Sequence, residues 1–228
     1  MKATQFKEYG EPDVLRLVEV DKPHAGPGEI RIAVRAVGVN AMDWKVRAGH
    51  MREMMPMPLP AGCGLDASGI VDEIGDDVDG VAVGDAVFGT GTNTYAEHAV
   101  LTDWAGKPDG LSFAEAAGYP VATATAQRIL DLVGVQAGQT VLISGAAGGV
   151  GSAAVQFARA RGANVIGTAS KANQRYVEAL GAIPTTYDEG MVERVRALAP
   201  DGIDAALDIA GSGVIPELIE LTGDASKV

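Results

Sequence analysis

The sequence predicts an α/β fold in which a β-rich N-terminal domain precedes a doubly wound parallel sheet. Residues 140–162 read as a short apolar strand, a glycine-rich turn and an apolar helix, which is how such a sheet opens. After residue 162 the alternation of strand and helix patterns continues. Residues 1–100 instead contain short strands separated by glycine and proline. We therefore expect a domain of residues 1–120 followed by one of residues 121–228.

The N-terminal domain is predicted from alternating polarity and frequent turn signals. Residues 29–40, EIRIAVRAVGVN, alternate so that Ile30, Ile32 and Val34 share one face. Further strands are expected at residues 15–20, 68–75, 84–89 and 94–101. This density of strands and turns indicates a twisted antiparallel or mixed β-domain.

Helical segments precede the glycine-rich unit. Ser112 followed by Glu115 forms a capping-box pattern, so a helix is expected over residues 113–117. The pair Tyr119-Pro120 is expected to end that helix, and a second helix is expected at residues 122–133.

The glycine-rich unit carries the main functional signal. Residues 141–143, Val-Leu-Ile, lack alternation, as in a strand buried on both faces of a parallel sheet. The turn keeps the spacing G-x-G-x-x-G with alanine in the first place, and a strand, glycine turn and helix predict a Rossmann site whose helix N-terminus faces a pyrophosphate. The alternative is a turn that merely needs close packing. The predicted cofactor contacts here are Ala146, Ala147, Gly148, Gly149, Val150 and Gly151.

The remaining elements follow the same alternation. Strands are expected at residues 165–168, 183–187 and 203–209, and helices at 171–180, 191–199 and 217–221. This order implies a parallel sheet with right-handed crossovers.

Composition excludes several classes of function. The net charge of −12 disfavours nucleic acid and anionic membranes as partners, and an apolar content of 47% indicates a folded chain. The single cysteine, Cys63, rules out a disulfide framework within one chain. No apolar run of membrane-spanning length and no signal-peptide pattern is present, so a cytoplasmic protein with a small-molecule substrate is expected.

Several motifs, in order, resemble those of one superfamily. They are Asn40-x-x-Asp43-x-x-x-Arg47-x-Gly49, Pro60-x-x-Gly64-x-Asp66-x-x-Gly69-x-Val71, Gly84-Asp85-x-Val87 and the glycine turn. The chain resembles the medium-chain dehydrogenase/reductase superfamily and, within it, the zinc-independent quinone oxidoreductase branch. The resemblance implies a GroES-like N-terminal domain and a Rossmann domain that binds a nicotinamide cofactor.

Three features of the zinc enzymes of that superfamily are missing from this chain. Those enzymes carry a cysteine near the position of Asn40 and a histidine at the position of Leu65, and they have a cysteine-rich structural zinc lobe. This chain lacks all three features, so the resemblance implies no zinc.

Length is a further departure. Members of the family continue for several strands beyond the fourth, whereas this sequence ends at Val228. We expect a Rossmann domain that is incomplete at its C-terminus, the alternative being an unusual short form, and a homodimer for the full-length protein.

The cofactor is predicted from the residues after the second strand of the Rossmann unit. A carboxylate there would bind a ribose 2′-hydroxyl and select NAD, but none is present. Ser170, Lys171 and Arg175 are suited to a 2′-phosphate, so NADPH is predicted. The alternative is that Lys171 and Arg175 are solvated helix residues.

The catalytic candidates come from the resemblance. It implies that Asn40 lies near the substrate carbonyl, that Thr125 contacts the nicotinamide, and that the backbone at Ala210 passes close to it. The alternatives are a turn-forming asparagine and a threonine that packs or caps a helix. No dedicated proton donor is evident; Tyr95 and Tyr119 are candidates, and water is the alternative.

Other polar and flexible residues have simpler interpretations. Asp43, Arg47 and Asp66 match motif positions but are expected to stabilise the β-domain rather than to catalyse. The methionine-rich residues 51–57 are expected to line a permissive substrate pocket or to fill the core.

Together these features predict an NADPH-dependent, zinc-independent oxidoreductase that reduces a quinone or an α,β-unsaturated carbonyl by hydride transfer. The alternatives are a zinc-free carbonyl or alcohol oxidoreductase and a non-catalytic NADPH-binding sensor or structural protein.

Overall fold

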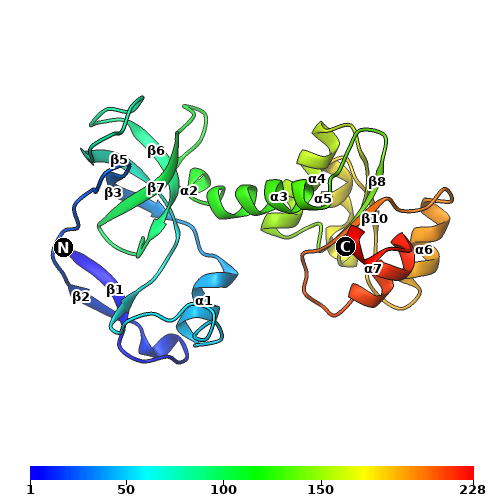
Figure 1. The fold of residues 1–228 in the computed structure, drawn as a ribbon, viewed down its shortest axis with the longest axis horizontal. Coiled ribbons are helices and arrows are strands. Elements are labelled where there is room, and N and C mark those ends of the chain that lie inside the picture. Colours follow the sequence, from blue (N-terminus) through cyan, green and yellow to red (C-terminus); the bar gives the residue numbers. More distant parts are fainter. The chain divides into compact units, whose positions relative to one another are not determined.

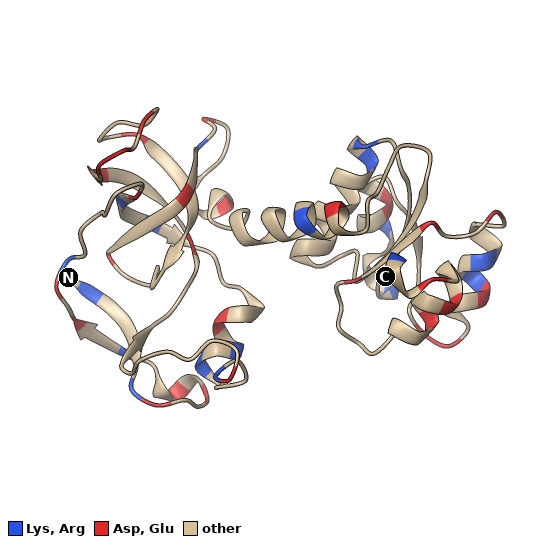
Figure 2. Ribbon diagram, in the orientation of Figure 1, with Lys and Arg blue, Asp and Glu red and all other residues tan.

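The computed structural model describes all of residues 1–228 (Figure 1). The chain forms two compact units, Met1–Val121 and Ala122–Val228, whereas the sequence interpretation placed the boundary after residue 120. Acidic and basic residues are interspersed along both units (Figure 2). None of the helices combines the length and the apolar character that crossing a membrane requires.

The first unit is built around a closed antiparallel barrel. Its strands are β3 (Ile30–Val37), β5 (Asp66–Ile74), β6 (Ala86–Thr92) and β7 (His98–Gly106). The barrel closes because β7 pairs with both β6 and β3. Ile30, Ile32 and Leu101 are fully buried inside it, as the alternation of residues 29–40 predicts.

A smaller sheet and short helices complete this unit. The sheet has the order β2-β1-β4, with β1 (Lys2–Phe6), β2 (Arg16–Glu19) and β4 (Ala61–Gly62). Helix α1 (Ala41–Arg47) begins directly after Asn40, and α2 (Phe113–Ala116) has the predicted Ser112–Glu115 capping box. Strand β1 and helix α1 were not predicted, and the strand expected at residues 94–101 instead begins at His98.

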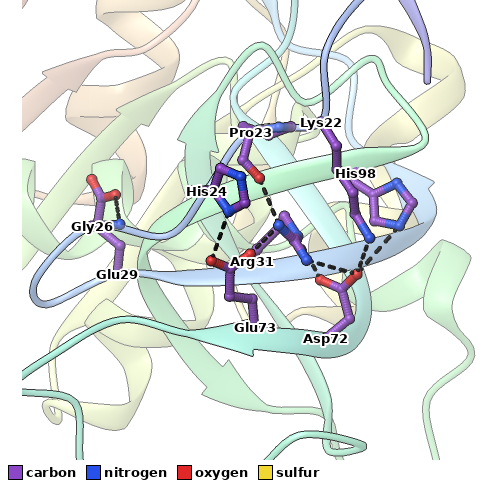
Figure 3. A network of polar contacts seen from close by, with 9 residues as sticks. All are labelled: Lys22, Pro23, His24, Gly26, Glu29, Arg31, Asp72, Glu73 and His98. Atoms are coloured by element: carbon purple, nitrogen blue, oxygen red, sulfur yellow. Dashed lines mark hydrogen bonds and ion pairs between the residues drawn. The ribbon is translucent and has the colours of Figure 1, made fainter.

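A polar network holds the segment after β2 against the barrel (Figure 3). The buried guanidinium of Arg31 on β3 donates to Asp72 on β5 at 2.8 Å and to the carbonyl of Pro23 at 2.7 Å, and it also pairs with Glu73. Lys22 lies 2.6 Å from the same Asp72 carboxylate. These charged residues therefore have a structural role, which is to join the segment after β2 to the barrel.

The second unit is a parallel sheet of order β10-β9-β8-β11, which confirms the predicted β-rich plus doubly wound fold class. Its strands are β8 (Thr140–Ser144), β9 (Asn164–Thr168), β10 (Ile183–Thr185) and β11 (Ala205–Asp208). Val141 and Ile143 pack in one hydrophobic cluster and Leu142 in another, and all are fully buried. Both faces of β8 are thus covered, which is why its sequence does not alternate.

Helices connect and cover these strands (Figure 1). They are α3 (Pro120–Leu132), α4 (Gly149–Ala160), α5 (Gln174–Ala179), α6 (Met191–Leu198) and α7 (Ile215–Thr222). Pro120 begins α3 instead of only ending the preceding helix, because the first helical turn needs no N–H donor there. The third strand of the unit ends at Thr185, so Tyr187 lies in the following loop and not in the strand that the sequence predicted.

Candidate functional site

The glycine turn of the second unit is tight enough to require glycine at two places. Gly145, directly after β8, has a φ of +80°, a conformation that side chains disfavour. A Cβ at Gly151 would lie 2.1 Å from the carbonyl oxygen of Gly145. Gly148 precedes α4 as its N-cap. The turn therefore brings the start of α4 close to the end of β8, with its first N–H groups unpaired inside the helix.

Ala146, at the first place of the fingerprint, has a packing role. It is fully buried, and its N–H donates to the carbonyl of Thr168 at 3.0 Å. Its Cβ fills the space above Gly167, where an added Cβ would lie 2.7 Å away. The alanine thus joins the turn to β9.

A cavity of about 630 Å³ lies at the carboxyl ends of β8, β9 and β11. This edge of a doubly wound sheet is where ligands bind, at the point where strand order reverses. Its walls are Ser144, Gly145, Ala147, Gly148, Gly149, Val150, Thr168, Ala169, Ser170, Asn173, Tyr187, Ile209, Ala210 and Ser212. Six of the predicted contacts line this cavity: Ala147, Gly148, Gly149, Val150, Ser170 and Ala210. Ala146 and Gly151 do not line it, and they shape the turn through close packing.

No ionisable acid or base lines this cavity apart from the hydroxyl of Tyr187. Lys171 instead lines an adjoining cavity of about 380 Å³, together with Ser170 and Asp188. Arg175 is exposed and lines neither cavity. Tyr187 lines both and was missed from the sequence, because no motif marks a tyrosine in the loop after the third strand.

In the first unit, Asn40 is held by a buried carboxylate. Its Nδ2 donates to Asp66 Oδ2 at 2.9 Å, and the backbone N–H of Val121 donates to Asp66 Oδ1 at 3.0 Å. Asp66 is only 1% exposed, and burial raises the pKa of its carboxyl although both hydrogen bonds oppose the rise. Since Asp66 accepts from the amide nitrogen, it fixes which way the Asn40 side chain faces.

A second carboxylate, Asp43, connects the same region to Tyr95. Asp43 Oδ2 accepts from the backbone N–H of Asn40 at 2.7 Å and from the Tyr95 hydroxyl at 2.9 Å. Burial, followed by the hydrogen bond to Asp43, raises the pKa of Tyr95 well above its ordinary value. The hydroxyl therefore keeps its proton and remains a donor. Tyr119, the other candidate, is 44% exposed.

An apolar cavity of about 250 Å³ lies beside Asp43. Met55 and Met57 from the methionine-rich segment line it, together with Met42, Phe6, Val46, Cys63 and Leu65. Burial raises the pKa of the Cys63 thiol, so the thiol stays neutral and acts as an apolar wall. Asp43 is the only carboxylate in the lining.

The comparisons with known proteins agree with this architecture. Residues 26–126 match the family model of the alcohol dehydrogenase GroES-like domain, and residues 149–227 match that of the zinc-binding dehydrogenase. The quinone oxidoreductase of Lama guanicoe is 32% identical, over 100% of this chain and 72% of that protein. The structure of the quinone oxidoreductase from Coxiella burnetii gives a TM-score of 0.84 at 36% identity, over 97% of this chain and 72% of that one. The chain belongs to the medium-chain dehydrogenase/reductase superfamily.

Other members of the superfamily extend the comparison. A mycobacterial protein determined in complex with NADPH is 31% identical with a TM-score of 0.85, covering 97% of this chain and 70% of that one. The CurK enoyl reductase is 29% identical with a TM-score of 0.87, covering 96% of this chain and 70% of that one.

Erythronolide synthase EryA2 of Saccharopolyspora erythraea is 39% identical over 86% of this chain. The chain spans 6% of that synthase and 53% of the quinone oxidoreductase of Pseudomonas aeruginosa. This superfamily member is thus related to quinone oxidoreductases and enoyl reductases and spans only part of some relatives.

The residues of this superfamily member do not fit the zinc ion for which its second family model is named. The Asn40 amide is bound to Asp66, and Leu65 lines the apolar cavity. No three histidine, cysteine or acidic side chains come together in a group able to hold a metal. The absence of zinc stays a prediction, which metal analysis of the purified protein tests.

Thr125, the predicted nicotinamide contact, is partly buried in α3 of the second unit. It does not line the cavity beside the glycine turn. Its role and that of Asn40 stay predictions.

Proposed function

We propose that this chain binds NADPH and belongs to a zinc-independent oxidoreductase that reduces a quinone or an α,β-unsaturated carbonyl. The observation that carries the proposal is the cavity of about 630 Å³ beside the glycine turn, which has no carboxylate at the end of β9. A carboxylate there would hydrogen-bond a ribose 2′-hydroxyl and repel a 2′-phosphate. An NADPH complex of a mycobacterial relative and the quinone oxidoreductases among the relatives support this assignment.

The glycine turn holds the pyrophosphate with backbone N–H groups at the start of α4, because these donors have no partner within the helix. Ser170 and Lys171 bind the 2′-phosphate as hydrogen-bond donor and cation. The backbone at Ala210, which lies beside Gly145, approaches the nicotinamide. When bound, the cofactor supplies the hydride.

The first unit supplies the substrate contacts. One N–H of the Asn40 amide donates to Asp66, and we assign the other to the substrate carbonyl, where negative charge develops as hydride adds. The apolar cavity beside Asp43 takes an apolar part of the substrate. Its methionines adapt to substrates of different shape.

Cofactor titration with wild-type chain and Lys171→Asp tests the assignment. NADPH and NADH binding is followed by the fluorescence of the nicotinamide. We expect the wild type to prefer NADPH and Lys171→Asp to reverse the preference, by about tenfold or more, because the new carboxylate repels the 2′-phosphate of NADPH and accepts a hydrogen bond from the 2′-hydroxyl of NADH. Arg128→Asp is the matched control, since Arg128 is exposed on α3, lines neither cavity and should change the ratio by less than about threefold.

Equal affinity of the wild type for the two cofactors would contradict the 2′-phosphate assignment. The reaction class is then tested by NADPH oxidation over a panel of quinones, enones and simple ketones. Turnover on ketones alone would favour a zinc-free carbonyl oxidoreductase. Tight NADPH binding without turnover on any compound would favour a sensor or structural protein.

A further inference from the structure

The loop after β10 is folded around a single guanidinium. Arg194 lies in the first turn of α6, and its side chain turns back onto residues 186–190. Its NH1 donates to the carbonyl of Glu189 at 2.8 Å. Its NH2 donates to the carbonyls of Thr186 at 3.1 Å and Asp188 at 2.9 Å, and it lies 2.6 Å from Asp188 Oδ1. One side chain thus satisfies three carbonyls and one carboxylate.

The loop needs this partner because it leaves the sheet. Strand β10 ends at Thr185, so the carbonyls that follow have no ladder partner. Gly190 then turns the chain into α6 with a φ of +80°. The planar, forked guanidinium matches several acceptors at once, which an ammonium group does not do. The conformation of residues 186–190 therefore depends on Arg194.

This loop carries groups that border the cofactor cavity. Tyr187 is 58% exposed and lines both the cavity of about 630 Å³ and the adjoining cavity of about 380 Å³. Asp188 lines the adjoining cavity together with Lys171. The hydrogen bond from Thr186 lowers the pKa of Asp188, and the charges of Arg194 and Lys171 lower it further. Lys171 and Asp188 thus carry opposite charges beside the same cavity.

We propose that Arg194 is a positioning residue for cofactor preference. It holds Tyr187 at the edge of the cavity and neutralises Asp188, which leaves Lys171 available to a 2′-phosphate. Without Arg194, Asp188 competes for Lys171 and repels the phosphate, since both are anionic. This inference rests on the proposed function, because it concerns the same NADPH site.

Titrations of the chain with NADPH and NADH test the proposal. Arg194→Met is expected to weaken NADPH binding by about tenfold and NADH binding by less than about threefold, because only NADPH carries the 2′-phosphate. Adding Asp188→Asn to Arg194→Met removes the competing carboxylate and should restore NADPH affinity to within about threefold of wild type. A loss of structure alone would not be reversed by this second change.

Arg196→Met is the matched control, since Arg196 lies on the same helix but pairs with Glu220 at 2.6 Å. It should leave both affinities unchanged. Arg194→Lys keeps the positive charge but removes the planar set of N–H donors that bonds several carbonyls at once. We expect it to lie between wild type and Arg194→Met, and it serves if Arg194→Met does not fold, as checked by circular dichroism.

An unchanged ratio of NADPH to NADH affinity in Arg194→Met and Arg194→Lys would overturn the inference while the proposed function stood, provided that the wild type prefers NADPH. Failure of Asp188→Asn to restore binding would also overturn it. A wild-type chain that binds neither cofactor, or that prefers NADH, would overturn both.

Discussion

The two candidate sites of this protein are made from different parts of the chain. The cavity in the second unit is walled mainly by glycine, alanine and serine residues, some of which belong to the glycine turn. The site in the first unit depends on side chains, because Asp66 and Asp43 hold Asn40 by its amide and its backbone N–H. The cavity in the second unit is therefore shaped by close backbone packing, and the site in the first unit is shaped by specific hydrogen bonds.

This difference determines how each site can fail. A cavity made by close backbone approach is lost when atoms are added, since a packed turn has nowhere to move. A hydrogen-bonded cluster is lost when one partner is removed, because the remaining polar groups stay buried without partners. Substitutions of the two kinds should thus affect the two units differently.

Adding one methyl group at Gly151 should give the largest effect. The new Cβ of Gly151→Ala would lie 2.1 Å from the carbonyl oxygen of Gly145, so the turn must move. We expect a loss of about 3 kcal/mol in stability and at least a tenfold loss of NADPH affinity. Circular dichroism during thermal unfolding and nicotinamide fluorescence measure the two effects.

Gly149→Ala is the folding control for this prediction. An added Cβ there has its nearest neighbour at 3.9 Å, and alanine suits the start of α4. Its stability should stay within about 1 kcal/mol of wild type. Equal stability of Gly151→Ala and wild type would refute the view that the turn is set by packing.

The sequence predicted the cavity in the second unit better than the site in the first. The fingerprint spacing is local, so residues 145–151 are read together, and the unalternating residues 141–143 correctly indicated a strand covered on both faces. The pairing of Asn40 with Asp66 joins residues 26 positions apart. Such contacts depend on barrel register, which a single sequence does not reveal.

Short elements and loop residues account for the other differences. Helix α1 is only 7 residues long, too short for a clear helical period, although Asn40 and Asp43 form its N-terminal cap. Tyr187 lies in an irregular loop whose shape is set by Arg194. Neither feature has a periodic signal in the sequence.

Asp66→Asn tests the side-chain site with the next largest effect. The new amide group would face the Asn40 amide with donor against donor, whereas Asp66 accepts from both Asn40 and Val121. We expect the first unit to lose about 2 kcal/mol in stability, with NADPH affinity unchanged. Both tryptophans, Trp44 and Trp104, lie in this unit, so their fluorescence in urea reports its unfolding.

The pH dependence of this effect has a defined sign. Burial raises the pKa of Asp66 in the folded state. The contribution of Asp66 to stability is therefore fully present below the pKa that its carboxyl has in the unfolded chain. It is lost as pH rises through the higher pKa that the carboxyl has in the folded chain. The cost of Asp66→Asn should be larger at about pH 3 than at about pH 6.

Asp72→Asn should show the opposite pH dependence of its stability loss within the same unit. Burial favours the neutral form of Asp72, but the bonds from Arg31 and Lys22 outweigh it and lower the pKa. Its contribution is present above the unfolded pKa and is lost as pH falls through the folded pKa, so this substitution should cost more at about pH 6. The same trend for both variants would contradict the assigned electrostatics.

Tyr95→Phe should have the smallest effect on stability, and it distinguishes the contribution of Asp43 from that of Asp66. It removes the hydroxyl that donates to Asp43 at 2.9 Å, but Asp43 still accepts from the backbone N–H of Asn40 at 2.7 Å. The first unit should therefore lose about 1 kcal/mol in the tryptophan-monitored unfolding, with no change in NADPH affinity. Tyr176→Phe, at an exposed position in the second unit, should change neither quantity.

The titration of Tyr95 gives this prediction a second readout. Because burial and Asp43 raise its pKa, alkaline difference spectra of the wild type should show a late tyrosinate step that is missing in Tyr95→Phe. A stability loss as large as that of Asp66→Asn would mean that Tyr95 supports Asn40 as strongly as Asp66 does, which would contradict the prediction. A loss near 1 kcal/mol with the late step removed would assign that support to Asp66.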